Sequence, residues 1–504
     1  MQNLHHQSHR YVTLFVLLLV AVASSGASRH AVAQEQVLSE QWYAVEVQDE
    51  QAGWSHAKTV RADGQITTLS EMRLKIARDG VTIRIQTASK FVETLGGEPV
   101  SMWSLVKYSD MPVETDWVFN EKTIDVTVTL NGEDTKMSEP RPTGNWLTPN
   151  EASEYTLKRI KAGADVITLS TIDASQGSAP FSVTRKVIDR EAELELNGVK
   201  YAAIECESTT SMAPTVVSKE FLDPNDGTVL SGTTGMGALV FSLKLTSKQQ
   251  ALQKVAAPEL MIDTLVSPDR AIQNPRAVTR MIAELSVKEG KMPELPNTGA
   301  QSVTRVGKDT LRLVIRIDEN TPAPEEDLTN ETYLASTTYL DYKNEAIGEI
   351  VTRALKGKEE APTAEKAEAI RAFVHRYVSS KNLDQGFATA TEVAKTQSGD
   401  CSEHGVLLAA MLRGAGIPSR VATGLIYVER FAGRRNVFGY HMWAQALIDG
   451  AWVDYDATLP MRFDATHVTV YTSALEDGGM MTDFSSMIPL LGQLEIRVIK
   501  VKAN

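Results

Sequence analysis

The spacing of apolar residues divides the chain into a strand-rich part followed by a helix-rich part. From about residue 40 to 320, apolar and polar residues alternate, as they do along Ile124–Leu130 and Leu311–Ile317. This alternation is typical of strands that are buried on one face. Short turn sequences, Arg78-Asp79-Gly80 and Asn197-Gly198, join two pairs of such runs, and we expect each pair to form a β-hairpin.

Breaks in the alternation set the limits of the strand-rich part. A stretch rich in Pro, Thr and Asn at residues 138–150 interrupts the alternating runs. We therefore expect a first β-rich domain at 34–150 and a second at 151–257. A β-rich connecting segment with an acidic, proline-bearing linker is expected at 258–335. No sequence repeat is evident, so these divisions depend on the composition of the breaks.

Helical patterns dominate the chain after this linker. We expect helices near 344–356, 363–378 and 389–395, the last of which opens with a Thr-x-x-Glu capping box. Residues 336–504 should form one α+β domain. The predicted fold class is therefore multidomain, with an N-terminal all-β region followed by an α+β domain.

The most helix-like run in the chain begins at a cysteine. Residues 401–413 are good helix formers, and the Gly-Ala-Gly-Ile-Pro sequence directly after them marks the end of the helix. Asp400 can cap the start, and Glu403 completes a capping box. Cys401 then lies in the first turn, where free backbone amides and the helix dipole favour the nucleophilic thiolate. A small, buried apolar residue is the alternative interpretation of Cys401.

A hairpin further along the chain supplies a histidine and a carboxylate. Asp449-Gly450 lies between two β-prone runs and predicts a two-residue turn. If Ile448 pairs with Ala451, Asp456 becomes a diagonal neighbour of His441 on one face of the sheet. An Asp at this distance can hold an imidazole by one hydrogen bond and fix its tautomer.

Other residues on the same face of this hairpin have weaker claims. Asp454 lies two residues further from His441 than Asp456 does, so it is the second candidate for the carboxylate. Trp443 and Trp452 also lie on this face and could shield the His–Asp pair from water. A nucleophile at a helix start, with a base held by a carboxylate, is the arrangement that activates a thiol.

Four blocks of this sequence resemble the bacterial transglutaminase-like superfamily. They are a Gly-x-Cys helix at 399–401, a Gly-Ile-Pro-x-Arg strand at 416–420, a His-x-Trp strand at 441–443 and a Trp-x-x-x-Asp-x-Thr strand at 452–458. All four follow the family's order, and the resemblance covers about residues 340–460. The chain departs from the family at Ala457, where Pro is common, and this should affect only the turn after Asp456.

The resemblance implies a papain-like, transglutaminase-like catalytic domain at 336–504. It implies Cys401 as the nucleophile, His441 as the base and Asp456 as the residue that orients the base. The backbone amide of Cys401 is expected to be one oxyanion donor, and Gln397 is a candidate for the other. The expected activity needs no cofactor.

Two further residues are candidates for lining the substrate site. Trp443 is one, because it shares a sheet face with His441. His404 is the other, three residues after Cys401 on about the same helical face. A residue one turn along a helix points away from a thiol at the helix start, so we do not expect His404 to be the base.

The expected function is an acyl transfer from a protein or peptide substrate. Cys401 would attack a peptide or side-chain amide, and hydrolysis of the resulting thioester is favoured over transfer to an amine. Arg430, Arg434 and Arg435 would repel an approaching ammonium, although a solvated loop is an equal interpretation of these residues. A cross-linking transglutaminase and a non-catalytic extracytoplasmic scaffold or binding protein are the alternatives.

The N-terminus predicts export. Arg10 precedes an apolar run from Tyr11 to Ala23, and cleavage sites of the Ala-x-Ala kind follow at Ala27 and Ala33. The run is too short to cross a bilayer comfortably. We therefore expect a signal peptide at 1–33 and a mature periplasmic or secreted protein without a stable membrane span. An uncleaved anchor is the alternative.

The net charge, the two cysteines and the spacing of possible metal ligands limit the partners and ligands that we expect for this chain. The net charge is −13 with no basic stripe, so nucleic acid is not an expected partner. The chain has two cysteines, and we expect Cys206 to be buried and Cys401 to be free. No cluster of His, Cys and carboxylates has the spacing of a metal site, so no metal is expected. The sequence says nothing about the oligomeric state.

Overall fold

The computed structural model describes residues 35–78, 81–108, 111–130, 132–236, 239–255, 257–258, 264–288, 291–380, 388–476 and 490–503. Contacts divide them into two compact units, the first comprising the strand-rich part up to Pro258 and the second the described residues from Thr264 onward. The predicted signal peptide at 1–33 lies outside the described residues. Within the described ranges, none of the helices has both the length and the apolarity that a membrane crossing requires.

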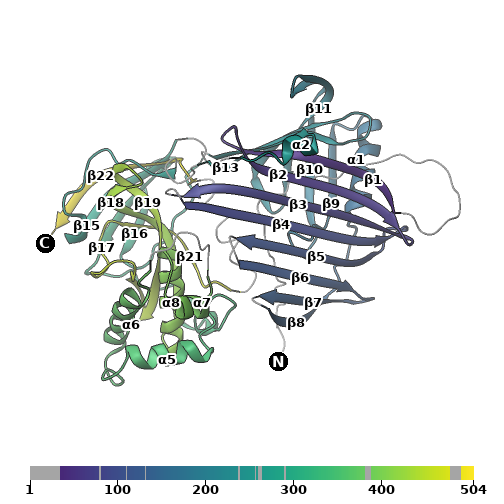
Figure 1. The fold of residues 1–504 in the computed structure, drawn as a ribbon. Coiled ribbons are helices and arrows are strands. Elements are labelled where there is room, and N and C mark those ends of the chain that lie inside the picture. Colours follow the sequence, from purple (N-terminus) through teal and green to yellow (C-terminus); the bar gives the residue numbers. More distant parts are fainter. Residues whose placement is uncertain are drawn as a thin grey trace. The chain divides into compact units, whose positions relative to one another are not determined.

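The first unit is built around one antiparallel sheet of 14 strands (Figure 1). The strands are β1 (Gln36–Val47), β2 (Glu50–Ala62), β3 (Gln65–Arg78), β4 (Val81–Thr94), β5 (Pro99–Tyr108), β6 (Met111–Phe119), β7 (Thr123–Leu130), β8 (Glu133–Pro140), β9 (Val166–Thr171), β10 (Phe181–Leu196), β11 (Val199–Thr210), β12 (Ala213–Leu222), β13 (Val229–Met236) and β14 (Leu239–Thr246). Strands β1–β8 form one meander and β9–β14 another. The two meanders meet where β1 pairs with β14, with Trp42 opposite Thr246.

This continuous sheet crosses the predicted boundary between 34–150 and 151–257. Strands from both expected β-rich domains hydrogen-bond directly, so the two segments share one sheet. The boundary falls in helix α1 (Pro149–Lys161), which the sequence analysis missed. Thr148 caps α1 in a capping box with Glu151, and this Thr-x-x-Glu signal was present in the sequence.

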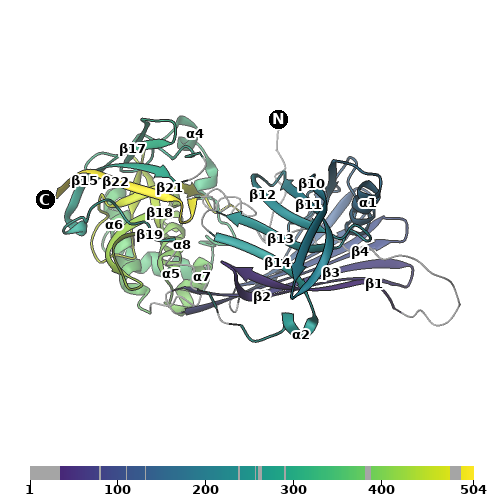
Figure 2. The same cartoon turned by 90° about the horizontal axis from the view of Figure 1, so that it is seen from above.

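Helix α1 covers part of the sheet and builds a core there. Its Ala152 and Ile160 are buried in clusters with apolar residues of β9 to β13, among them Cys206. The sheet curves strongly around this end (Figure 2). A short helix, α2 (Lys248–Ala251), follows the last strand of the unit.

The second unit contains two antiparallel sheets of four strands each. The order in one is β16 (Gln301–Arg305), β17 (Thr310–Arg316), β15 (Val278–Val287) and β22 (Leu494–Ala503). The order in the other is β20 (Ala451–Tyr455), β19 (Arg434–Ile448), β18 (Ser419–Phe431) and β21 (His467–Ser473). One apolar core joins the two sheets, because Leu425, Phe438 and Val468 pack with Leu285, Leu313 and Ile496.

The helices of this unit gather beside β18 and β19. They are α5 (Glu345–Ala354), α6 (Thr363–Tyr377), α7 (Ala390–Thr396) and α8 (Cys401–Gly414), preceded by the short turns η1 (Pro275–Ala277), α4 (Glu325–Leu328) and η2 (Glu331–Leu334). Every residue of α8 from Ser402 to Arg413 is buried. Gly405 lets α8 approach β19 closely, because a Cβ at that position would lie 3.0 Å from Met442. The four predicted helices and the predicted fold class are confirmed.

Candidate active site

The start of α8 holds the cysteine as the sequence predicted. Asp400 caps the helix, because its Oδ1 accepts a hydrogen bond of 2.8 Å from the backbone N–H of Ser402. Glu403 completes the capping box by accepting the N–H of Asp400 at 2.8 Å. Cys401 is the first residue of the helix and is partly exposed. Its amide therefore belongs to the group that has no acceptor within the helix.

Glu403 supports this helix start from a fully buried position. Its Oε1 also accepts the N–H of Ala388, at 3.2 Å, and so links α8 to the segment before α7. Burial, followed by the nearby charge of Asp400, raises the pKa of Glu403 to about 8. Burial therefore favours the protonated form of Glu403 near neutral pH.

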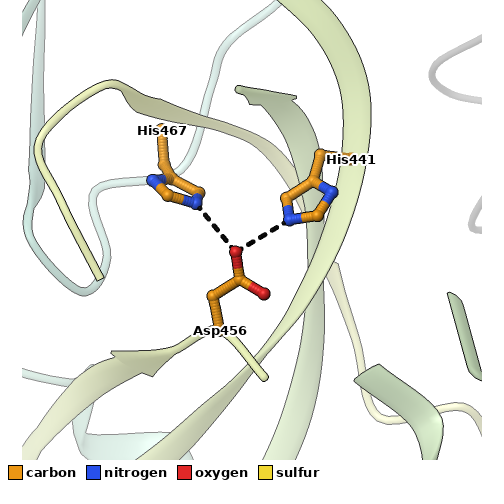
Figure 3. A group of neighbouring side chains, drawn as sticks. All are labelled: His441, Asp456 and His467. Carbon is orange, nitrogen blue, oxygen red and sulfur yellow. Dashed lines mark hydrogen bonds and ion pairs between the residues drawn. The ribbon is translucent and has the colours of Figure 1, made fainter. Parts of the chain in front are cut away.

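The β19–β20 hairpin brings the histidine and the carboxylate together. Ile448 pairs with Ala451, so the predicted register is confirmed. Nε2 of His441 lies 2.9 Å from Oδ2 of Asp456 (Figure 3). The second oxygen of Asp456 accepts the N–H of Thr458 at 2.7 Å. Because Nε2 faces Asp456, Nδ1 is the ring nitrogen of His441 that remains for another partner.

Electrostatics favour charge separation across this pair. Burial alone would lower the pKa of His441, but the charge and hydrogen bond of Asp456, and then the Cys401 thiol, raise it to about 10. Burial alone would raise the pKa of Asp456, but His441 and then His467 hold it well below its usual range. The buried carboxylate thus stabilises an imidazolium beside the sulfur.

A second histidine contacts the same carboxylate, and the sequence analysis did not find it. Nε2 of His467, the first residue of β21, lies 3.2 Å from Oδ2 of Asp456. Its Nδ1 lies 2.9 Å from the backbone oxygen of Asp464. Figure 3 shows both imidazoles directed at one oxygen of Asp456. The signal available in the sequence was Asp464-x-Thr466, which forms a turn directly before a β-branched run.

Aromatic rings enclose the two imidazoles. Trp443 is fully buried, with its ring 6.1 Å from that of His441 and 5.3 Å from that of His467. The indole N–H of Trp443 donates to Asp454 at 2.8 Å. Phe463 stacks on His467 with ring centroids 4.2 Å apart. Trp443 thus forms part of the packing around the pair, while its contact with substrate stays a prediction.

The other aromatic and acidic candidates on the hairpin serve different networks. Trp452 donates to Asp327 and packs against Arg420, away from the imidazoles. Asp454 accepts hydrogen bonds from Gln445 and from the backbone of Ala300 in addition to Trp443. Asp456, rather than Asp454, is therefore the carboxylate that contacts His441, and its orienting role in catalysis stays a prediction.

His404 and Gln397, which flank Cys401 in the sequence, differ in their surroundings: the side chain of His404 is buried and that of Gln397 is exposed. Nδ1 of His404 lies 2.6 Å from the backbone oxygen of Asp400, and burial lowers the pKa of this imidazole. Gln397 ends α7 in a left-handed conformation, and its backbone oxygen accepts the N–H groups of Ser379 and Ser380. Its side chain is exposed. An oxyanion role for Gln397 and a substrate contact of His404 stay predictions.

Helix α6 fixes the chain directly after β20. Arg371 is buried and donates to the backbone oxygens of Asp456, at 3.2 Å, and of Leu459, at 3.0 Å. His375 contacts the backbone oxygen of Ala457 at 3.0 Å. These contacts fix the backbone of the segment from Asp456 to Leu459 against α6.

Residues 350–457 match the family model described as "Transglutaminase-like superfamily". This chain contains a transglutaminase-like domain. The matched range includes Cys401, His441 and Asp456, whereas His467 lies beyond it. The resemblance inferred from the four sequence blocks is confirmed.

Two solved structures are similar to the chain that carries this transglutaminase-like domain. One, from Cytophaga hutchinsonii, is described as "a Putative Cysteine Protease"; it is 16% identical, with 45% of this chain and 86% of that chain covered and a TM-score of 0.26. The other, from Parabacteroides distasonis, is described as "a putative protease". It is 12% identical, with 80% of this chain and 70% of that chain covered and a TM-score of 0.20. No curated protein matches the chain.

Three side chains of the transglutaminase-like domain are close enough to share a metal ion. Ligand atoms of His441, Asp456 and His467 all lie within 4.8 Å of one another in the described residues. Both Nε2 atoms, however, point at Oδ2 of Asp456 itself, at 2.9 and 3.2 Å (Figure 3). A metal would need an empty point about 2 Å from all three atoms. The geometry is that of a hydrogen-bonded group, in which the oxygen occupies the central position.

Proposed function

We propose that this chain is an exported cysteine hydrolase that cleaves amide bonds of protein or peptide substrates. The observation that carries the proposal is the 2.9 Å hydrogen bond between His441 Nε2 and Asp456 Oδ2 in a domain whose nucleophile begins a buried helix. That bond fixes the imidazole with its free nitrogen available to Cys401. A thiol with such a partner is a nucleophile at neutral pH.

The reaction proceeds in two halves. The Cys401 sulfur attacks the carbonyl carbon of the amide, an S–C bond forms, and the amide C–N bond breaks as Nδ1 of His441 gives its proton to the departing nitrogen. Water then attacks the thioester and gives a proton to His441, and the sulfur leaves as a thiolate. Asp456 stays ionised throughout and stabilises the imidazolium. The Cys401 amide and Gln397 are the proposed oxyanion donors.

Water is the proposed acceptor, because hydrolysis needs only water, which is abundant outside the cytoplasm, and because cations on the β18–β19 hairpin do not favour a lysine. Arg430 pairs with Arg435 across the β18–β19 turn, and both side chains are exposed. They lie six residues along the hairpin from the level of His441, where they would repel an approaching ammonium group and tolerate a substrate that carries carboxylates.

Labelling with iodoacetamide tests the nucleophile. The folded protein is treated at pH 7 and the modified residue is mapped by mass spectrometry. We expect modification at Cys401 that falls strongly in His441→Ala. Cys206 is the internal control, because it is fully buried and burial raises its pKa to about 11. Equal labelling of both cysteines, or labelling that ignores His441, would favour a non-catalytic scaffold.

Product analysis tests the acceptor. Peptide substrates are incubated with and without a labelled primary amine, and the products are identified by mass spectrometry. We expect free carboxylates to dominate in both samples. Predominant incorporation of the amine would make the chain a cross-linking transglutaminase.

Amino-terminal sequencing of the protein isolated from outside the cytoplasm tests export, and we expect a start near Ser28 or Gln34.

A further inference from the structure

Asp456 is shared by two imidazoles, and the second one has no part in the proposed reaction. His467 is fully buried, with Nε2 3.2 Å from Oδ2 of Asp456 and Nδ1 2.9 Å from the backbone oxygen of Asp464. Its ring centroid lies 5.8 Å from that of His441. His467 is thus close enough to influence the catalytic base without touching the substrate.

Both ring nitrogens of His467 face atoms that accept hydrogen bonds. The backbone oxygen of Asp464 has no proton to give, and Asp456 is ionised because two imidazoles hold its pKa well below its usual range. A neutral imidazole carries a lone pair on one nitrogen, and that lone pair would face one of these two oxygens. A doubly protonated ring is the form that satisfies both contacts.

The surroundings of His467 can support a buried cation. Arg276 of η1 lies 2.8 Å from Asp464, and Asp464 also lies 3.6 Å from Nδ1 of His467. The charged or titratable groups around His467 therefore come from four other places: His441 on β19, Asp454 and Asp456 at the end of β20, Asp464 before β21 and Arg276 on η1. The two cations His467 and Arg276 alternate with the carboxylates of Asp456 and Asp464, so each buried charge has an opposite neighbour.

We infer that His467 is a positioning residue of the triad, a buried imidazolium that fixes Oδ2 of Asp456 and moderates its attraction for the proton of His441. This inference rests on the proposed function for its catalytic meaning. Asp456 alone would hold the proton on His441 very firmly, although the base must release that proton to the departing amine. The positive charge of His467 opposes this hold and favours the thiolate of Cys401.

The variant His467→Gln tests this role, because Gln keeps a donor for Asp456 and removes the charge. The measurement is the rate of Cys401 alkylation by iodoacetamide between pH 4 and 11. Loss of a cation raises the pH at which the thiolate forms and also the pH at which His441 loses its proton. The pH profile of alkylation has a lower limit, where the Cys401 thiolate forms, and an upper limit, where His441 loses its proton. We expect both limits to move up by about one pH unit. His56→Gln is the control, since His56 lies on β2 of the first unit and pairs with Glu40, and its limits should stay unchanged.

A purely structural His467 would lower the melting temperature and leave both pH limits where they are, and that result would overturn the inference. If His467→Gln does not fold, ¹⁵N NMR of the unaltered protein decides. We expect both nitrogens of His467 to carry protons at pH 7, and a neutral ring would equally contradict the inference. Neither measurement uses an amide substrate. If the protein hydrolyses no amide, the proposed function fails, but the charge of His467 and its effect on Cys401 can still be established. If His467 is neutral or has no effect on the pH limits, this inference fails, but the proposed function remains.

Discussion

Gly399 lies directly against the side chain of Glu403: a Cβ added to Gly399 would be 2.2 Å from Cβ of Glu403. Gly399 also has a φ of +153°, which L side chains rarely adopt. Since Glu403 belongs to the capping box of α8, this contact sets how closely the chain before Cys401 approaches its own helix.

Gly399→Ala should therefore displace the helix start that carries the nucleophile. We expect a loss of about 2–3 kcal/mol in the free energy of unfolding, measured by urea denaturation, and a loss of Cys401 labelling in the fraction that folds. Gly348→Ala is the control, because Gly348 lies on the exposed face of α5 with nothing within 4 Å of an added Cβ. That variant should gain up to about 1 kcal/mol. Equal effects at the two glycines would show that the contact with Glu403 is unimportant.

Substitution of the two hairpin carboxylates should separate catalysis from stability. Asp456→Asn should reduce amide turnover by about 10²–10⁴-fold, because it disturbs the tautomer of His441. Asp454→Asn should leave turnover per folded molecule near the parent value. It should cost about 2 kcal/mol of unfolding free energy, since Asp454 accepts three buried hydrogen bonds, from Trp443, Gln445 and Ala300. Turnover is measured beside the folded fraction, and similar losses of turnover in both variants would contradict this assignment.

Cys401→Ala should abolish turnover and leave the fold intact. The cysteine is partly exposed at the first position of α8, so few packing contacts depend on it. Circular dichroism and thermal melting of the Ala variant should match those of the parent. Residual turnover at the parent rate would exclude a thiol mechanism altogether.

Glu403 should make stability depend on pH. Its pKa is about 8 in the folded protein against about 4.3 in an unfolded chain, so the folded state binds the proton more tightly. The stability that Glu403 contributes is complete below about pH 4.3 and is lost as the pH rises through about 8. Glu403→Gln carries no titrating group, although it loses an acceptor for Ala388 at every pH. The difference in melting temperature, Gln variant minus parent, should grow between pH 5 and 9, and a constant difference would refute a neutral Glu403.

Arg420 should be needed for stability as an arginine. Its guanidinium donates to Thr298, Asp327 and Gln445 at once and lies 3.9 Å from the ring of Trp452. Lysine cannot reproduce this planar set of donors, so Arg420→Lys should cost about 2–3 kcal/mol by urea denaturation. Arg430→Lys, at an exposed position, should change stability by less than about 0.5 kcal/mol. A tolerated Arg420→Lys would mean that charge alone is sufficient.

Local signals predicted the nucleophile helix and the hairpin well. Asp400 and Glu403 specify the start of α8 through neighbouring residues, and Asp449-Gly450 specifies the register that brings Asp456 to His441. Each of these predictions depends on residues that are close in the chain, where capping and turn geometry dominate.

Features that depend on distant pairing could not be predicted in the same way. His467 reaches Asp456 only because β21 pairs with β18, with His467 opposite Ile426, and no short-range pattern specifies that pairing. The single sheet of the first unit likewise depends on the pairing of β1 with β14, about 200 residues apart in the chain. Alternation identified the individual strands, but it carries no information about which strands become neighbours.

The core of the second unit is incomplete until strand β22, near the end of the chain, has joined it. This strand pairs with β15, so that Val287 lies opposite Leu494, and its Ile496 and Val498 enter the core shared with Leu425 and Phe438. About 80 residues separate the end of α8 at Gly414 from the start of β22 at Leu494, so this core cannot close until that whole stretch has joined it. Until then the folding chain has Cys401 at the start of α8 but lacks the complete apolar core against which strand β19 packs. Reactivity at Cys401 should accordingly appear only after β22 has joined the fold, as one of the last steps of folding.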